Sequence, residues 1–439
     1  MKDIGKIFVV PSKWDAKLGR RGGCQPPCKG LFPSIVEKMW FLCIISYYKI
    51  LMETEMKGQW IGKFSEITSS GNKITGSVII NIDEAPTHYQ GVATLIEDDP
   101  KFPDIYAFFM TNDKSRNFII NRVAFLPINP ENGMPVKTAD DWGIIKQRYG
   151  VEKISNMVEV QGTLEEDKLM LRWTSESGAK GNCVFNKSKA GEPSEYKPTL
   201  DINDWNDYKN YVNDLEDRRF IFRGHKDNRR RLRTTFHRGG RADLNKFERE
   251  DIETLHKHLC ARTRHFFDLK DPKENGAFHN LIRHHGYPTP LLDWTYSPYV
   301  AAFFAYREIT NSDASKAGED KKVRIFIFDQ EEWQKDFNRV NILRYSYPYI
   351  SILDALAIDN ERMIPQQAVS TMTNIDDIED FIRRKESEKN KKYLEVVDMP
   401  LKYRKKVMQE LSRMGITAGS LFPGLDGACE ELKERFFDI

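Results

Sequence analysis

The strongest constraint on the fold of this chain is a regular series of short β-type segments between Gly58 and about Phe185. Turn residues separate the segments, including Ser-Gly-Asn at 70–72 and Asn-Pro-Glu-Asn-Gly at 129–133. Short strands at this spacing predict a mostly antiparallel domain, either a closed barrel or a sandwich. We expect the strands at Lys73–Asp83, Tyr89–Ile96, Ile105–Met110, Phe118–Leu126, Val158–Leu164, Leu169–Trp173 and Cys183–Phe185.

The segment Gly58-Gln-Trp-Ile-Gly62 stands at the start of this series and is similar to the opening of lipocalin-type barrels. A tryptophan there is explained by packing alone, so we expect Trp60 to plug one end of the barrel as part of its core. No residue pattern in this half of the chain indicates catalysis.

The composition changes after residue 190, and this change sets the predicted domain boundaries. Residues 191–200 are polar, contain two prolines and are typical of a linker. We predict an N-terminal extension at 1–51, a β-barrel-like domain at 52–190, this linker, and an α+β domain at 201–439.

Within the α+β domain, a helix at 246–267 should bury one face through Ile252, Leu255, Leu259 and Phe266. The other elements that we expect are helices at 205–215, 298–306, 376–392 and 402–414, strands at 220–222 and 323–328, and a polar loop at 311–322.

Composition places the chain among soluble globular proteins, with 40% hydrophobic and 30% charged residues. A formal charge of +2 argues against a wholly basic nucleic-acid-binding protein and is compatible with a local basic patch. The six cysteines are scattered without zinc-ligand spacing, so we expect reduced thiols, a cytoplasmic location and no bound metal. The apolar segment Met39–Leu51 is shorter than the ~20 residues of a spanning helix, so we expect no membrane partner.

A basic segment, Arg218–Arg241, contains ten Lys and Arg residues against one Asp. Such a segment can bind nucleic acid or the phosphates of a dinucleotide, and charged residues of a solvated loop give the same pattern. Within it, Arg223 follows a predicted strand, and its guanidinium suits a phosphate or carboxylate. Gly224 lets the backbone turn or approach a ligand closely, although a structural ion pair explains the Arg-Gly pair equally well.

The densest cluster of functional residue types lies between His284 and Pro298. Asp293, Thr295 and Ser297 alternate as they would on one face of a strand. The two hydroxyl groups can donate to a ligand, and Ser297 can equally cap a helix that begins at Pro298. Further along, Gln366 supplies a carboxamide that can orient a ribose but cannot act as a general base.

Four ordered segments of this half resemble the FRG domain, a bacterial family named for its Phe-Arg-Gly motif. Phe222-Arg-Gly224 matches that motif, and His284–Thr295 is similar to the family pattern Gln-His-aromatic-Gly-x-Pro-Thr-Arg-Leu-Leu-Asp-Trp-Thr. Arg362–Thr371 and Leu421–Gly427 resemble two later family motifs, so the resemblance covers roughly residues 200–439.

The chain departs from the family pattern at four positions. Arg283 stands where the family usually has Gln, and Pro290 where it has Arg. Ala368 replaces a Gly and Ser370 a Phe. The change at Pro290 removes a candidate anion contact.

The order of these motifs is similar to that of ADP-ribosyltransferases, which implies NAD as the cofactor. By this analogy Arg223 would hold a pyrophosphate or ribose, with Gly224, Asp293, Thr295 and Ser297 completing the cofactor site. Gln366 and His284 are then the catalytic candidates.

We therefore predict an FRG-domain protein of bacterial or phage origin that binds a nucleotide and transfers ADP-ribose, in a defence or toxin context. Two other hypotheses remain open at this stage: nucleic-acid binding through Arg218–Arg241 without catalysis, and a non-catalytic protein-interaction module.

Overall fold

The computed structural model describes residues 55–120, 122–151, 158–353 and 355–437, which belong to one compact unit of the chain. The predicted extension at 1–51, with its apolar segment, lies outside these residues. Among the helices described, none combines the length and the hydropathy needed to cross a membrane.

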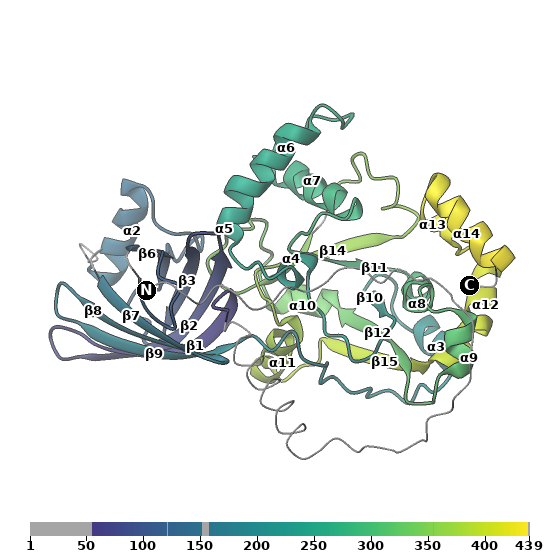
Figure 1. The fold of residues 1–439 in the computed structure, drawn as a ribbon, viewed down its shortest axis with the longest axis horizontal. Coiled ribbons are helices and arrows are strands. Elements are labelled where there is room, and N and C mark those ends of the chain that lie inside the picture. The colour runs from purple at the N-terminus through teal and green to yellow at the C-terminus, as the bar shows by residue number, and fades with distance from the viewer. Residues whose placement is uncertain (1–54, 121, 152–157, 354, 438–439) are drawn as a thin grey trace, which may run out of the picture. The chain divides into compact units, whose positions relative to one another are not determined.

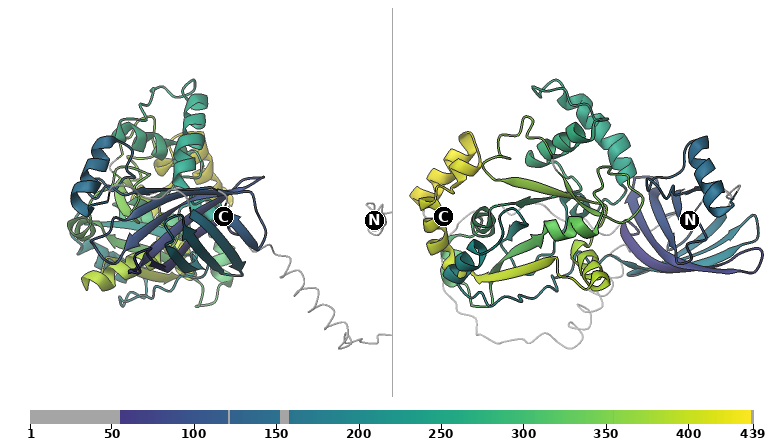
Figure 2. Two further views of the ribbon diagram at one scale, coloured as in Figure 1. Left: turned by 90° about the vertical axis from the view of Figure 1, so that its left-hand side faces the viewer. Right: turned by 180° about the vertical axis from the view of Figure 1, so that it is seen from behind.

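The N-terminal half forms a nine-stranded antiparallel sheet in the order β5-β7-β8-β9-β1-β2-β3-β4-β6. Its two edge strands, β5 and β6, follow each other directly in the chain, so the sheet curves into a nearly closed barrel (Figures 1 and 2). The strands are β1 Gly58–Ile67, β2 Lys73–Glu84, β3 Tyr89–Glu97, β4 Ile105–Thr111, β5 Asn117–Ile120, β6 Arg122–Pro127, β7 Val158–Glu165, β8 Lys168–Ser175 and β9 Lys180–Lys187.

Of the two predicted architectures, the structure has the barrel-like one, with three differences from the predicted elements. The first strand, β1, was not among the expected strands. The expected strand Phe118–Leu126 is divided into β5 and β6, because its halves pair with β7 and β4 on opposite edges of the sheet. A helix that was not predicted, α2 Ala139–Tyr149, begins at a capping box formed by Thr138 and Asp141.

Trp60 belongs to the barrel core, as predicted. Its side chain is fully buried, and its indole Nε1 donates to the Met56 carbonyl at 2.7 Å. A buried indole needs an acceptor for its one N–H, and the backbone supplies it here.

The C-terminal half contains a six-stranded antiparallel sheet in the order β13-β14-β11-β10-β12-β15. The strands are β10 Phe220–His225, β11 Leu291–Thr295, β12 Lys322–Asp329, β13 Ile350–Leu353, β14 Ala368–Thr373 and β15 Leu394–Pro400. The helices are α3 Trp205–Asn213, α4 Thr235–Arg238, α5 Leu244–Lys246, α6 Glu253–Leu259, α7 Pro272–His284, α8 Pro298–Tyr306, α9 Asn311–Lys316, α10 Gln330–Asp336, α11 Ile378–Lys389, α12 Arg404–Arg413, α13 Ala418–Leu421 and α14 Leu425–Phe437.

Helices cover both faces of this sheet. On β12, Ile325 and Ile327 pack against α3, α8 and α12, whereas Phe326 and Phe328 pack against α10 and α11. Because successive side chains of a strand point to opposite faces, a strand between two helical layers must be apolar throughout. This is why the predicted strand at 323–328 lacks the alternation of a half-exposed strand.

Two further predictions in this half were wrong. The expected helix at 246–267 ends at Leu259 after a π-helical turn at Phe247–Ile252, and Phe266 is 70% exposed instead of lying on its buried face. The loop expected at 311–322 contains α9, which begins at a capping box formed by Thr310 and Asp313.

The segment 191–200 contains no helix or strand and is hydrogen bonded to the C-terminal half. The Ser194 backbone N–H donates to the Arg229 carbonyl at 2.7 Å, and Arg324 Nη2 donates to the Tyr196 carbonyl at 2.9 Å. These contacts fix the path by which the chain leaves β9.

A buried histidine on α7 should make folding sensitive to acid. Neither ring nitrogen of His279 has a hydrogen-bond partner, and burial lowers its pKa to about 4 from the ordinary 6.5. Between these values the unfolded chain binds a proton that the folded protein does not, so stability falls as pH drops from about 6.5 to about 4, by up to ~1.4 kcal/mol per pH unit. We expect His279→Leu to flatten this dependence, as measured by urea unfolding at pH 7 and pH 5. An unchanged difference between the two pH values would contradict this.

Candidate functional site

The Phe-Arg-Gly motif forms half of β10, and its three residue positions have three different surroundings. Phe222 is buried in the core beside α8. A Cβ atom on Gly224 would lie 2.0 Å from the Ala301 carbonyl oxygen, so the glycine lets α8 pack directly on the strand. Arg223 alternates with these two residues and therefore points away from α8. The close backbone approach predicted for Gly224 is thus made by a helix of the same chain.

The guanidinium of Arg223 is held by two acceptors. Its Nη1 donates to the Asp293 carbonyl, and its Nε donates to His225 Nε2 at 3.1 Å. Arginine can only donate, so His225 Nε2 accepts, and the ring carries its proton on Nδ1, which donates to the Arg230 carbonyl at 3.2 Å. Burial, followed by the charges of Arg223 and Arg230, holds the pKa of His225 well below its usual value. The neutral His225 orients Arg223.

Asp293 is the carboxylate of this region and is paired with Arg283. Arg283 Nη2 and Nε donate to the two oxygens of Asp293 at 2.7 and 3.3 Å. Burial alone would raise the pKa of Asp293, but the charges of Arg283, Arg223 and His284 outweigh it and hold the pKa below its usual value. Asp293 is therefore ionised at neutral pH and is already engaged by an arginine.

Two more arginines, Arg230 and Arg238, lie close enough to Arg223 for their charges to affect its pKa. Burial lowers the pKa of Arg223 to about 9; Asp293 opposes this shift, and the charges of Arg283, Arg238 and Arg230 add to it. Partial loss of hydration, followed by the charges of Arg230 and Arg283, lowers the pKa of Arg238 to about 10. We call Arg223, Arg230, Arg238 and Arg283 the arginine cluster.

The arginine cluster has an excess of positive charge. Among the described residues, no carboxylate lies within salt-bridge distance of Arg223, Arg230 or Arg238, and only Arg283 has one. Like charges held together cost free energy unless a counter-charge is present. Perturbed ionisable groups with such a shortage of partners are typical of binding sites for charged ligands.

Most other basic residues of Arg218–Arg241 are neutralised within the protein. Arg231, for example, is buried beside Asp377 and Glu195. The remaining pairs are Arg219–Asp329, Lys226–Glu308, Arg229–Asp227, Arg233–Asp376 and Arg241–Asp83. The excess of positive charge seen in the sequence is therefore concentrated in the arginine cluster.

Three of the predicted ligand contacts are occupied by internal hydrogen bonds. Thr295 Oγ1 donates to the Gln366 carbonyl at 2.7 Å, and the Gln366 side-chain Nε2 donates to the Leu421 carbonyl at 2.9 Å. Ser297 Oγ accepts the Val300 backbone N–H at 3.2 Å and so caps α8. All three side chains are at least nine-tenths buried. These side chains therefore stabilise the fold, through internal hydrogen bonds and the cap of α8. A role in ligand binding stays a prediction.

His284, the second catalytic candidate, is the last residue of α7 and lies near Asp293 and Arg283. Its Nδ1 is hydrogen bonded to the side-chain amide of Asn360, and Arg362 Nη1 donates to its carbonyl at 3.3 Å. Burial lowers the pKa of His284, against an opposing effect of Asp293. A neutral imidazole is therefore available beside the arginine cluster at pH 7.

Sequence reasoning identified Arg223, Asp293 and His284, which the structure brings together. It did not assign Arg283, Arg238 or His225 to the site. Arg283 carried a signal, because it stands ten positions before Asp293 at the end of the helix that leads into β11. Arg238 carried no such signal in the sequence, because no nearby residue distinguishes it from the paired arginines around it.

No curated protein matches the chain. A redesigned β-barrel, mFAP0, solved with bound DFHBI, is 12% identical, with a TM-score of 0.20, and the match covers 30% of this chain and 98% of that one. Rv2717c from M. tuberculosis is 7% identical, with a TM-score of 0.19, and the match covers 32% of this chain and 96% of that one. Scores this low support no conclusion about function.

One family matches within the C-terminal half. Residues 218–314 match the FRG domain, and they include the Phe-Arg-Gly strand, the arginine cluster, His284 and Asp293. The motifs at 362–371 and 421–427 lie beyond the matched residues. The chain therefore contains an FRG domain at residues 218–314.

Proposed function

We propose that the FRG domain binds a phosphate-bearing nucleotide at the arginine cluster. The observation that supports this is the charge balance: four guanidiniums and one carboxylate leave three positive charges in excess. A diphosphate would supply the missing negative charge, and guanidiniums donate bidentately to phosphate oxygens.

NAD is the nucleotide that we propose first, with ADP-ribosyl transfer as the reaction. Arg223, Thr295 and Gln366 come from β10, β11 and the residues just before β14, which are neighbours in the sheet. This arrangement is compatible with the motif order implied by the family resemblance. In this proposal Arg223 and Arg238 bind the pyrophosphate, and His284 contacts the ribose. A bacterial defence role stays a prediction from the resemblance.

Nucleic-acid binding is the weaker candidate. A nucleic-acid interface requires a row of free cations along the phosphate backbone, whereas six of the ten basic residues of Arg218–Arg241 are paired with carboxylates. The charge that remains is compact, which favours a single nucleotide.

The binding proposal predicts a large effect of Arg238→Ala. Arg238 is an exposed residue whose guanidinium is only partly desolvated, so its removal should leave the fold intact while it removes one cation from the cluster. We expect ADP to bind the variant at least ~10-fold more weakly, a loss of about 1.4 kcal/mol. The matched control is Arg229→Ala, from the same segment, whose guanidinium is paired locally with Asp227. The measurement is isothermal titration calorimetry at two salt concentrations. The proposal is excluded if ADP and NAD both fail to bind the parent, or if the two variants behave alike.

Transfer and binding are separated by incubating the parent with labelled NAD. Release of nicotinamide that Arg223→Ala abolishes would support an ADP-ribosyltransferase. If ADP binds but no nicotinamide is released with any candidate acceptor, the result would support a nucleotide-binding module and contradict ADP-ribosyl transfer.

A further inference from the structure

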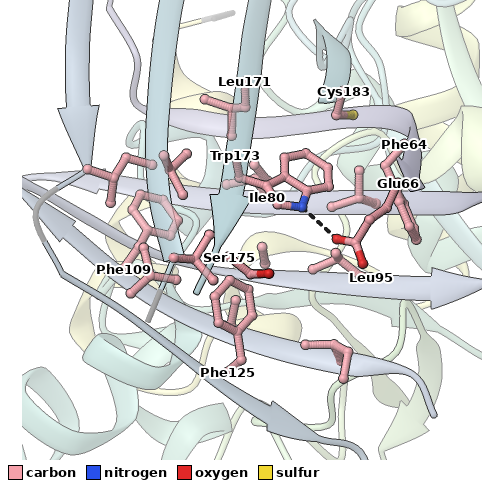
Figure 3. Close-up of a pocket in the computed structure, with 18 of the residues that line it drawn as sticks. Phe64, Glu66, Ile80, Leu95, Phe109, Phe125, Leu171, Trp173, Ser175 and Cys183 are labelled. Carbon is pink, nitrogen blue, oxygen red and sulfur yellow. Dashed lines mark hydrogen bonds between the residues drawn. The ribbon is translucent and has the colours of Figure 1, made fainter. Parts of the chain in front are cut away.

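The interior of the barrel is hollow. A cavity of about 320 Å³ lies between the inward faces of its strands, with aliphatic and aromatic walls that include Phe64, Phe109, Phe125 and Leu171 (Figure 3). An apolar cavity of about 150 Å³ admits a benzene-sized molecule, so this one has room for a bicyclic ligand. Pockets of this size and lining are typical of sites for small molecules.

Two carboxylates, Glu66 and Glu97, are the charged residues among the described side chains that line the cavity. Glu66 is paired with Ile74 of β2, and Glu97 is paired with Gly76 of the same strand. The two carboxylates therefore extend from β1 and β3 on either side of β2, at the same end of the barrel. Within the described residues 55–120, 122–151 and 158–187, no lysine, arginine or histidine lines the cavity with them.

Glu66 is held in place by Trp173. The indole Nε1 donates to Glu66 Oε2 at 2.7 Å (Figure 3). The contact crosses β9 at Gly181, which is paired with both residues and whose Cβ, if present, would lie 2.1 Å from the Trp173 ring. The barrel thus fixes one carboxylate and one aromatic ring side by side.

Glu97 has no such partner. Its Oε2 is buried without a hydrogen bond, and its strand neighbours Ala93 and Leu95 line the same cavity. Burial, followed by the charges of Glu66, Asp104 and Asp98, raises the pKa of Glu97 to about 8. A buried acceptor without a donor is unfavourable, and a ligand that brings the donor would recover that free energy.

We propose that the barrel is a second ligand site, which binds a small apolar amine with its ammonium group at Glu97 and Glu66 and its apolar body in the cavity. Glu66 gives the cavity a negative charge, and no described lining residue is cationic, so the carboxylate of a fatty acid or an aromatic acid would meet like charge there. An aromatic amine gains an additional contact, because its cation lies beside the Trp173 ring.

Three ligands with the same indole-ethyl body test this proposal: tryptamine, its alcohol tryptophol, and indole-3-propionic acid. We expect calorimetry to give the order amine, alcohol, acid, with at least ~10-fold between the amine and the acid. Because Glu97 is largely protonated at pH 7 and ionises beside a bound ammonium, tryptamine should release up to about one proton, measured in two buffers of different ionisation enthalpy. Absence of tryptamine binding, or tighter binding of the acid, would overturn the proposal.

Variants locate the site. Glu97→Gln keeps the shape and removes the charge, and we expect it to weaken tryptamine binding at least ~10-fold and to abolish the proton release. Glu165→Gln, at an exposed position of the same barrel, is the matched control. Ala93→Phe fills the cavity and should exclude all three ligands. Equal binding by the parent and Glu97→Gln would place the amine elsewhere. Arg238→Ala should bind tryptamine normally, so this test is independent of the nucleotide proposal.

Discussion

Replacement of Gly224 by alanine is expected to destabilise the FRG domain by about 3 kcal/mol or more. The new Cβ would lie 2.0 Å from the Ala301 carbonyl oxygen and 2.6 Å from the Ala305 amide nitrogen, and both are backbone atoms of α8. Backbone atoms of a helix cannot rotate away as a side chain can, so α8 must move off the sheet. That movement would open the core that Phe222 shares with α8. Urea unfolding followed by circular dichroism measures the loss.

Gly143→Ala is the matched control for this variant. Gly143 lies inside α2, and nothing approaches its Cβ position within 4 Å. Alanine there should stabilise the protein by about 0.5–1 kcal/mol, because glycine is the poorer helix former. A Gly224→Ala protein as stable as the parent would show that α8 does not pack as described.

Arg324→Met is expected to cost about 3–5 kcal/mol. Arg324 and Asp398 face each other on β12 and β15, both nearly fully buried, with Nε and Nη2 donating to the carboxylate at 2.7 and 2.9 Å. The same guanidinium donates to Ser194 Oγ and the Tyr196 carbonyl, which holds the segment 191–200. Methionine leaves the carboxylate buried without its cation and releases that segment.

A double-mutant cycle separates the ion pair from its surroundings. Asp398→Leu alone should also be strongly destabilising, whereas Arg324→Met combined with Asp398→Leu should be closer to the parent, because no unpaired charge is then buried. The free energies of unfolding of the parent, the two single variants and the double variant give the coupling free energy between Arg324 and Asp398. Additive effects of the two substitutions would show that the pair is not coupled in the folded protein.

Much of this architecture is readable from local sequence. Most barrel strands, and β10 and β12 in the C-terminal half, follow from residue type and turn residues. Ser297 caps α8, which is one of the two roles that its sequence context offered. Caps, turns and strand periodicity involve residues a few positions apart, so the information for them is local. Arg223 was a site candidate for the same reason, since a strand followed by Arg-Gly is a local pattern.

Other features depended on pairings between distant positions. Phe118–Leu126 looks like one strand and is two, because its halves meet different partners across the barrel. The basic segment looks uniform, yet Arg231 meets Asp377, 146 positions away, while Arg238 meets no carboxylate among the described residues. Which charges are neutralised is set by strand order and register.

The two candidate sites differ in the same way. Part of the arginine-cluster site can be inferred from motifs, because Arg223 and the neighbouring carboxylate Asp293 stand in recognisable local contexts. The barrel site cannot be inferred from motifs, because Glu66 and Glu97 look like ordinary strand glutamates in the sequence. Only the pairing of their strands with β2 and β9 places them at one end of the cavity, near Trp173. Local chemistry placed the elements, and contacts between residues far apart in the chain determined where charge is left without a partner.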